Sequence, residues 1–435
     1  MSEPFEAGSC LVVLPRLSAD VGKKREAASR LDEAVGLAQA IDFDVVEAAA
    51  FNVSKPRPAT LFGKGAVETI KELAETHDHS GREIDVIIVD AQLSPVQQRN
   101  LEQEWQCKVI DRTGLILEIF GARAQTREGR LQVELAALSY QKSRLVRSWT
   151  HLERQRGGAG FMGGPGETQI EMDRRMIGKR IARINLDLKE VRRTRGLHRN
   201  ARQRVPYPVV ALVGYTNAGK STLFNRLTGA DVVVADQLFA TLDPTMRAIT
   251  LGDGQKAIIS DTVGFISNLP HELVNAFHAT LEELTEADLV LHVRDISHPD
   301  TEIQKTDVFE VLAEIGEDKD FAKPVIEVLN KIDRLDAETR EYHLNKTGRT
   351  DAPTAAVSAI TGEGCEALLE EIARFLSERF ETIEVTLSYA DGAETAWFYE
   401  HGEVLERDDA EDGVHLKVRL APENIARYRD HASIR

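Results

Sequence analysis

The sequence predicts an α/β protein in which two regions with mostly parallel sheets are separated by a long antiparallel helical hairpin and followed by a small α+β region. Two observations lead to this class. Short apolar runs alternate with helical repeats at the start of the chain and again after residue 206, which is typical of parallel sheets with crossover helices. Between them lie two segments with heptad spacing. We therefore expect four domains, at 1–125, 126–205, 206–379 and 380–435.

The first domain, 1–125, is expected to be an α/β subdomain. Apolar runs at 10–15 (CLVVLP) and 85–90 (DVIIVD) suit buried parallel strands. The segment between them has a helical apolar face made of Leu31, Val35, Ala38 and Ile41. Ser94 and Pro95 form the N-cap and first turn of another helix. The segment 107–120 (CKVIDRTGLILEIF) supplies a further strand and its connection.

The second domain, 126–205, is expected to be a helical hairpin with a glycine-rich tip. Apolar residues repeat at heptad steps before the tip, at Leu131, Leu135, Leu138, Leu145, Trp149 and Leu152. They repeat again after it, at Ile170, Ile177, Ile181, Ile184, Leu188 and Val191. Six glycines fall within 157–167, and Thr168 with Glu171 has the capping-box pattern that would start the second helix. Two helices joined by one loop make an antiparallel arm, about 39 Å long for about 26 residues.

Charge is distributed unevenly along the chain. The net charge is −17, yet residues 121–205 hold 20 Lys and Arg against 8 Asp and Glu, which leaves 34 basic and 63 acidic residues elsewhere. A basic segment in an acidic protein indicates a localised site for a polyanion. Arginine dominates this segment, and arginine pairs with phosphate bidentately and stacks on bases. The alternative is a solvated charged surface on an exposed helical pair.

Composition favours a cytoplasmic protein. Hydrophobic residues make up 42% and charged residues 29%, as in ordinary globular chains. No run of about 18 apolar residues occurs, so no integral membrane segment is expected, and the first residues lack the pattern of a signal peptide. Cys10, Cys107 and Cys365 are isolated, which fits a reducing compartment. The last domain, 380–435, is acidic and carries no motif.

A phosphate-binding loop is predicted at 214–222 (GYTNAGKST). It follows the apolar run VVALV and precedes a helical pattern, which is the context that such a loop needs. Its glycines allow backbone N–H groups to surround phosphates at a helix N-terminus. Lys220 is expected to reach the β- and γ-phosphates, and the Ser221 hydroxyl to ligate Mg²⁺.

Three further motifs follow in the order expected for a guanine-nucleotide domain. In 261–264 (DTVG), Asp261 can hold the Mg²⁺ shell and the Gly264 N–H can sense a γ-phosphate. In 330–333 (NKID), the Asp333 carboxylate can accept from guanine N1–H and N2–H₂ while Asn330 faces N7 and O6, and adenine lacks that donor pair. In 358–364 (SAITGEG), the Ala359 N–H can contact guanine O6. Lys331 is expected to pack over the base and support the phosphate loop.

The segment 238–247 (LFATLDPTMR) is expected to be a switch loop whose threonine completes Mg²⁺ coordination. Thr241 and Thr245 both qualify on chemistry, and the residues alone do not separate them. Many small GTPases place a glutamine after D-x-x-G to orient the attacking water, but this chain has Phe265 there. We therefore expect slow intrinsic hydrolysis that a partner stimulates.

With these motifs, the sequence closely resembles the HflX GTPases, of the Obg–HflX branch, over about residues 10–370. The most specific stretches lie outside the nucleotide motifs, at 58–70 (PATLFGKGAVETI), 93–102 (LSPVQQRNLE), 111–136 and 163–175 (GGPGETQIEMDRR). The resemblance implies that Thr241 is the Mg²⁺ ligand with Ser221, that Lys220, Thr241 and Gly264 are the catalytic residues, and that Phe265 is a trait of the branch. It implies GTP or GDP contacts from Gly214, Tyr215, Thr216, Asn217, Ala218, Gly219, Lys220, Ser221, Thr222, Phe239, Ala240, Thr241, Leu242, Asp243, Asp261, Thr262, Val263, Gly264, Asn330, Lys331, Ile332, Asp333, Ser358, Ala359 and Ile360.

The resemblance also implies a partner, the ribosome. HflX proteins bind mainly the large subunit and split or rescue ribosomes under stress, with the hairpin loop reaching toward the rRNA of the peptidyl-transferase centre. The matching RNA-binding residues would be Arg154, Arg156, Gly163, Gly164, Arg174 and Arg175. Many relatives have an arginine where this chain has Gly164, so its neighbours would have to compensate. We expect a monomer that does not bind DNA.

Two other functions are kept as alternatives. The first is a GTP-gated regulator of another protein complex, such as a membrane protease, with peripheral association at the membrane. The second is an ATP-dependent RNA helicase that uses the N-terminal domain, because some family members bind ATP there. The ATP candidate lies near Lys64 in LFGKGA, which lacks a full phosphate-loop pattern and also fits a glycine turn that enters a helix. The C-terminal domain varies in the family, so the resemblance implies no function for it.

Overall fold

In the computed structural model, the N-terminal α/β unit contains a four-stranded parallel sheet in the order β2-β1-β3-β4. The structure describes residues 8–17, 27–79, 83–155, 165–202, 207–229, 238–243, 245–251, 254–267, 284, 287–315, 323–346, 353–379, 381–390, 392–410, 412–420, 424–425 and 428–429. The strands and helices of the unit are β1 (Ser9–Leu17), α1 (Ala27–Gln39), β2 (Asp44–Val53), α2 (Lys64–His79), β3 (Val86–Val89), α3 (Pro95–Trp105), β4 (Lys108–Asp111) and α4 (Arg112–Arg123).

Helices cover both faces of this sheet, because alternate residues of the buried strand β1 point in opposite directions. Leu11 and Val13 pack with α2 and α3, whereas Cys10 and Val12 pack with α1 and α4. The predicted N-cap Ser94 is confirmed, since its side chain accepts the Gln97 N–H and the Gln97 side chain accepts the Ser94 N–H. Trp105 closes the α2–α3 side and donates its indole N–H to a backbone carbonyl of α2.

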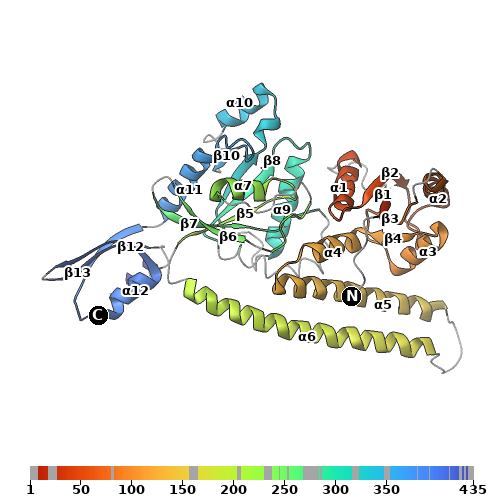
Figure 1. Ribbon diagram of the computed structural model, residues 1–435, viewed down its shortest axis with the longest axis horizontal. Coiled ribbons are helices and arrows are strands. Elements are labelled where there is room, and N and C mark those ends of the chain that lie inside the picture. The colour runs from red at the N-terminus through yellow and green to blue at the C-terminus, as the bar shows by residue number, and fades with distance from the viewer. Residues whose placement is uncertain are drawn as a thin grey trace.

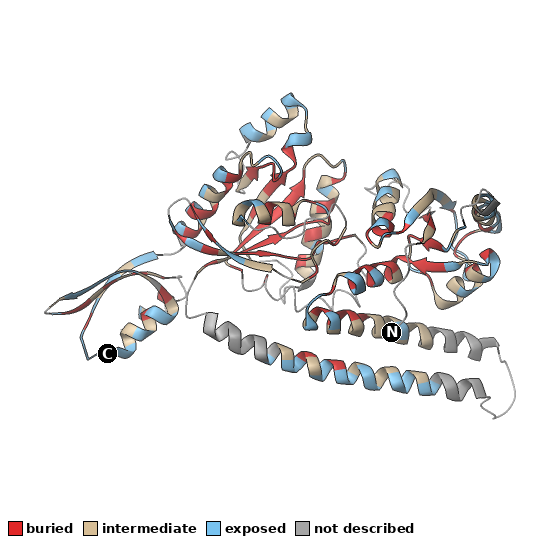
Figure 2. Ribbon diagram, viewed as in Figure 1, coloured by how far each residue is buried: buried red, intermediate tan, exposed pale blue. Residues whose placement is uncertain are grey.

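The predicted antiparallel hairpin is confirmed by α5 (Arg127–Gln155) and α6 (Pro165–Arg202), which lie side by side as a long arm (Figure 1). Arg180 of α6 pairs with Glu134 of α5 at 2.6 Å. Ile184 and Leu188 of α6 are buried, as the heptad spacing predicts. Most of the described outer surface of α6 is exposed (Figure 2).

One detail of the hairpin prediction is wrong. The second helix begins at Pro165, so Thr168 lies inside it and does not cap its start. The fixed φ of proline suits a first helical position, which explains the earlier start. Among the described side chains of α5, Val133 and Ala136 are buried and the predicted leucines are half-buried, because α5 also packs against α3 and α4. The side chains of Trp149 and Leu152 lie outside the described residues.

The third unit is built on a six-stranded sheet in the order β10-β9-β8-β5-β7-β6, parallel except for the edge strand β6. Its described elements are β5 (Val209–Val213), α7 (Lys220–Thr228), β6 (Thr245–Thr250), β7 (Lys256–Asp261), β8 (Leu289–Asp295), α9 (Thr301–Ile315), β9 (Val325–Asn330), the short helix η2 (Ile332–Arg334), α10 (Ala337–Lys346), β10 (Thr354–Ala356) and α11 (Cys365–Arg379). The apolar core on one face of this sheet continues into the N-terminal unit.

The C-terminal unit is a three-stranded antiparallel sheet with one helix against it. It consists of β11 (Glu381–Leu387), α12 (Gly392–His401), β12 (Gly402–Ala410) and β13 (Gly413–Leu420), with β13 in the centre. Phe398 of α12 is fully buried against Leu416 and Val418. The overall α/β class, with mostly parallel sheets, therefore agrees with the prediction. None of the described helices has the length and apolar character that crossing a membrane requires.

Candidate nucleotide-binding site

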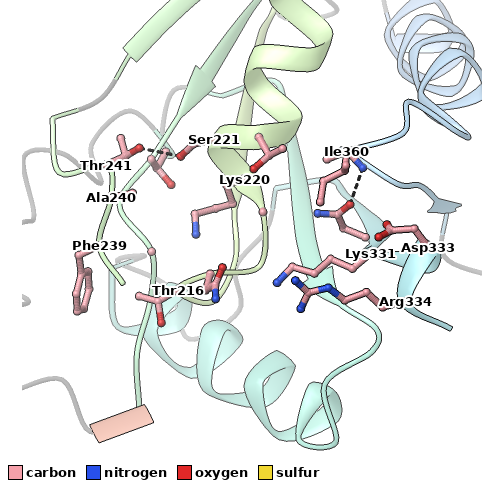
Figure 3. A pocket seen from close by; sticks show the side chains of 17 residues that line it. Thr216, Lys220, Ser221, Phe239, Ala240, Thr241, Lys331, Asp333, Arg334 and Ile360 are labelled. Atoms are coloured by element: carbon pink, nitrogen blue, oxygen red, sulfur yellow. Dashed lines mark hydrogen bonds between the residues drawn. The ribbon is translucent and has the colours of Figure 1, made fainter. Parts of the chain in front are cut away.

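A pocket of about 280 Å³ lies where β5, β7, β9 and β10 end, so that the four predicted motifs meet there (Figure 3). Parallel strands bring the loops that follow their carboxyl ends to one edge of the sheet. The lining residues are Thr216, Asn217, Gly219, Lys220, Ser221, Thr222, Phe239, Ala240, Thr241, Thr262, Gly264, Asn330, Lys331, Asp333, Arg334, Ala359 and Ile360.

The phosphate loop has the backbone that its glycines allow. Gly214 has φ +154°, and a Cβ there would overlap the carbonyl oxygen of Val293 on the neighbouring strand β8. Gly219 has φ +91° and immediately precedes α7, whose N-terminus faces the pocket. The buried Lys220 Nζ donates to the carbonyls of Gly214 at 3.1 Å and Tyr215 at 2.8 Å. Burial lowers the pKa of Lys220 to about 8, so the lysine remains mostly cationic at neutral pH.

Three oxygen donors meet beside this lysine. Ser221 Oγ lies 2.8 Å from Thr241 Oγ1 and 2.7 Å from Asp261 Oδ2, and Thr241 Oγ1 lies 2.9 Å from the same carboxylate oxygen. Neighbouring ligands of an octahedral Mg²⁺ ion lie about 3.0 Å apart, for ligand distances of about 2.1 Å. The other oxygen, Asp261 Oδ1, is buried and has no hydrogen-bond partner among the described residues. The donor set and its spacing therefore fit a magnesium site, whereas Thr245 lies in strand β6 opposite Asp261 and outside the pocket lining.

Gly264 comes close to the phosphate loop. A Cβ on it would lie 2.9 Å from Thr216 Cα and 3.1 Å from Lys220 Nζ. The next residue, Phe265, is buried and exchanges backbone hydrogen bonds with the loop, from Phe265 N to Gly214 O (3.1 Å) and from Thr216 N to Phe265 O (2.7 Å). The Phe265 side chain lies in the core and does not line the pocket.

Replacing Gly264 by alanine is expected to lower the GTP turnover rate by about 100-fold, the size of effect seen when one positioned donor is lost. The added methyl group meets backbone at Thr216, which cannot move aside as a side chain would. Single-turnover hydrolysis measures the effect. Gly178→Ala is a suitable control because a Cβ there meets open space. Equal turnover by Gly264→Ala and the wild-type protein would contradict the role of Gly264.

The guanine end of the pocket is held by hydrogen bonds between motifs. Asn330 Nδ2 donates to Ala218 O at 2.8 Å, and Asn330 Oδ1 accepts the Ala359 N–H at 3.0 Å. Ser358 Oγ donates to Asp333 Oδ1 at 2.6 Å. The Asn330 amide and the Ala359 N–H are thus bonded to each other's loops in this structure, and the guanine contacts of these two residues stay predictions.

Lys331 has φ +67°, and its Nζ pairs with Asp295 at 2.8 Å. Sequence reasoning missed Arg334, which lines the pocket beside Lys331 (Figure 3). Its place directly after N-K-x-D was the available signal. It also missed Arg226, whose Nε donates to the Ala359 carbonyl at 3.1 Å and so holds the loop that contains Ile360.

Some predicted nucleotide contacts do not line the pocket. Leu242 is buried in the core, and Ile332 is buried in a small apolar cluster with Leu329 and Ala356. Asp243 binds the start of α5. The remaining residues without a place in the lining are Asp261, at the end of β7, and the loop residues Gly214, Tyr215, Ala218, Val263 and Ser358.

The predicted RNA-binding residues are only partly described. Arg174 and Arg175 are exposed on α6, as an RNA contact requires. Arg156, Gly163 and Gly164 lie outside the described residues, and the side chain of Arg154, on α5, is also outside them. Lys64, the ATP candidate, is exposed at the start of α2 and does not line the pocket described above.

Comparison with known proteins places this geometry in a family. Family models match in succession the GTP-binding GTPase N-terminal region (28–121), the GTP-binding GTPase middle region (123–202), the 50S ribosome-binding GTPase (209–331) and the HflX C-terminal domain (343–429). GTPase HflX of Magnetococcus marinus is 51% identical over 99% of this chain and 96% of its own length. The chain belongs to the HflX family of GTPases. GTPase HflX of Escherichia coli is 44% identical over 84% of this chain and 83% of its own length.

The HflX similarity extends further than the sequence predicted. The expected end near residue 370 is wrong, because the HflX C-terminal domain matches to residue 429. Among solved structures, a GTP-binding protein from the archaeon Sulfolobus solfataricus in complex with GDP is 24% identical, with a TM-score of 0.44, over 84% of this chain and 98% of that chain.

Proposed function

We propose that this HflX-family GTPase hydrolyses GTP with the help of Mg²⁺ and uses its nucleotide state to control docking of the α5–α6 arm on the large ribosomal subunit. The observation that carries the hydrolytic part is the cluster of Ser221, Thr241 and Asp261 beside the buried Lys220. Docking would lead to splitting or rescue of stalled ribosomes, and hydrolysis would release the factor.

The chain's own residues account for binding and orientation of GTP. The α7 N-terminus and Lys220 bind the phosphates, and Ser221 and Thr241 hold the metal with Asp261 behind them. Mg²⁺ would neutralise charge that develops on the phosphate oxygens. The Gly264 N–H is available to the γ-phosphate, and Asp333 accepts the guanine donors. Since Phe265 is buried, no side chain at that position orients the water, which supports slow hydrolysis that a partner stimulates.

The ribosomal part is supported by the arm and by the relatives. The family model that matches 209–331 is described as a 50S ribosome-binding GTPase. The two helices of the arm are joined along α6 by the buried Ile184 and Leu188, and Arg174 and Arg175 are exposed toward the tip. A stiff support with exposed arginines suits insertion into rRNA, where phosphate pairing supplies the affinity. A cytoplasmic location and a monomeric state follow from this proposal.

Changing Arg154, Arg156, Arg174 and Arg175 together to glutamine is expected to abolish co-sedimentation with large subunits in the presence of a non-hydrolysable GTP analogue. At low salt, where residual binding can be measured, the slope of log affinity against log salt concentration should become shallower by about 0.7–0.9 for each arginine–phosphate pair that the changes remove. Deleting 157–167 should have the same effect on sedimentation. Changing Arg374 of α11 and Arg407 of β12, two exposed arginines outside the arm, to glutamine is the control for loss of positive charge.

The same experiment separates the alternatives. An arm that binds a protein complex should tolerate the four arginine changes, so retained binding would favour the GTP-gated regulator. If neither the wild-type chain nor any variant associates with large subunits, the ribosomal proposal is wrong while the GTPase assignment remains.

A further inference from the structure

The switch segment 238–243 contacts the N-terminal unit on both sides of Thr241. Two residues before it, the Phe239 ring lies edge-on to Phe120 of α4, with ring centroids 4.7 Å apart and an interplanar angle of 84°. Both rings are almost fully buried, at 2% and 1% exposure. Such edge-to-face pairs stabilise a fixed arrangement beyond the burial of area alone. The part of the switch segment that precedes Thr241 is therefore held in the apolar core that the two units share.

Two residues after Thr241, Asp243 binds the start of the arm helix. Its Oδ2 accepts the backbone N–H of Gln125 at 2.9 Å and that of Thr126 at 2.9 Å, and the Thr126 hydroxyl donates to Oδ1. The same hydroxyl accepts the Gly129 N–H at 2.9 Å. Since α5 begins at Arg127, Thr126 is the N-cap residue whose hydroxyl accepts an N–H of the first turn, and Asp243 binds the two N–H groups that lead into the helix, where a carboxylate is stabilised by the helix dipole. Asp243 thus holds the N-cap residue of α5 from a distant part of the chain.

The contact also depends on the small size of Gly129. A Cβ at this position would overlap Asp243 Oδ1, and would lie 3.2 Å from Thr126 Oγ1. Gly129 lies inside α5, where alanine is ordinarily the better helix former. Substitution by alanine should therefore stabilise the helix while it displaces the Asp243 carboxylate. Any loss of activity in this variant would then come from the lost contact and not from a less stable α5.

We propose that Asp243 is a positioning residue for GTP hydrolysis. Bound to Gln125 and Thr126 at the start of α5, it holds the switch segment so that Thr241 stays within reach of Ser221 and Asp261. This inference rests on the role of Thr241 in the proposed function. Linkage makes the coupling reciprocal, so a nucleotide that holds Thr241 in the pocket also stabilises the first turn of the arm helix.

The test compares full-length variants by the kcat and KM of GTP turnover and by the affinity for GDP. Asp243→Ala and Gly129→Ala are each expected to lower kcat about tenfold, with GDP affinity changed less than about twofold, because Thr241 acts on the γ-phosphate side. Thr126→Ser retains the hydroxyl and should keep the wild-type rate. Ser94→Ala removes an N-cap from α3, remote from the switch, and is the matched control for loss of a cap.

Three results would overturn the proposal. The first is an unchanged kcat in Asp243→Ala and Gly129→Ala. The second is a raised kcat in these variants, which would mean that the contact restrains the switch segment. The third is a loss of GDP affinity in these variants that equals their loss of kcat. Thr241→Ala distinguishes the proposed function from this inference. If that variant alone keeps full turnover, the role of Thr241 fails, whereas a slow Thr241→Ala with a normal Asp243→Ala refutes only the positioning role.

Discussion

Replacing Asp333 by asparagine is expected to change the base preference of this GTPase from guanine to xanthine. The Asp333 carboxylate would accept two hydrogen bonds from guanine N1–H and N2–H₂, and each charge-assisted bond contributes about 1.5–3 kcal/mol. Losing both should reduce kcat/KM for GTP by a factor on the order of 10²–10⁴. Xanthine carries a carbonyl where guanine has its amino group, so the amide N–H₂ of the variant can donate to it and XTP turnover should rise.

The structure provides a matched control for this change. Asp336, three residues further on, accepts hydrogen bonds from Thr339 N at 2.9 Å and Thr339 Oγ1 at 2.8 Å at the start of α10, and it does not line the pocket. Asp336→Asn should leave both nucleotide preferences unchanged. Competition between GTP and XTP in one turnover assay measures the ratio directly. A variant at Asp333 that still prefers GTP would show that the base is read elsewhere.

The nucleotide site is the part of this molecule that sequence predicts best, because its requirements are local. Gly214 and Gly219 occupy backbone conformations that other residues rarely adopt, so their positions in the sequence mark the loop geometry itself. The buried strands around them are short apolar runs such as Val209–Val213, which are also local signals. The four loops meet because parallel strands end at one edge, a rule of the fold class.

Contacts between distant segments could not be predicted in this way. Arg112 illustrates the difficulty, since it is buried between Glu33 at 2.6 Å and Asp90 at 2.5 Å, and also donates to the Ser267 carbonyl at 3.0 Å. A single arginine in a sequence does not reveal which carboxylates it meets. The edge strand β6 escaped prediction for a similar reason, as its partly exposed residues have neither a continuous apolar run nor a clear alternation.

Contacts of this kind connect the N-terminal unit to the phosphate loop. The Tyr215 hydroxyl donates to Glu33 at 2.5 Å and accepts the Ser267 N–H at 2.9 Å. Arg112 pairs with the same Glu33, so the loop, the segment after Gly264 and helix α4 share one hydrogen-bonded network. Breaking a buried charge pair is strongly destabilising, which makes this network a rigid connection between the nucleotide site and the unit that carries the arm.

Replacing Lys220 by alanine is expected to reduce kcat/KM for GTP by roughly 30- to 5,000-fold. The change removes the partner of the bound phosphates, and truncating one partner of a buried charge pair costs about 2–5 kcal/mol of binding free energy. Stability should not fall with it. Because burial lowers the pKa of Lys220 from 10.5 to about 8, the charged lysine destabilises the nucleotide-free fold below pH 8, and this effect disappears as the pH rises toward 10.5. The thermal midpoint of the nucleotide-free variant at pH 7 should therefore equal or exceed that of the wild type.

Lys64→Ala is the comparison that gives the Lys220 result its meaning. Lys64 is exposed at the start of α2 and outside the lining of the nucleotide pocket, so its loss should leave nucleotide hydrolysis unchanged. Turnover of both GTP and ATP is measured for the two variants and for the wild type. Hydrolysis of ATP that survives in Lys220→Ala and is lost in Lys64→Ala would place a second nucleotide site in the N-terminal unit. Loss of all hydrolysis in Lys220→Ala alone would assign the chemistry to the loop between β5 and α7.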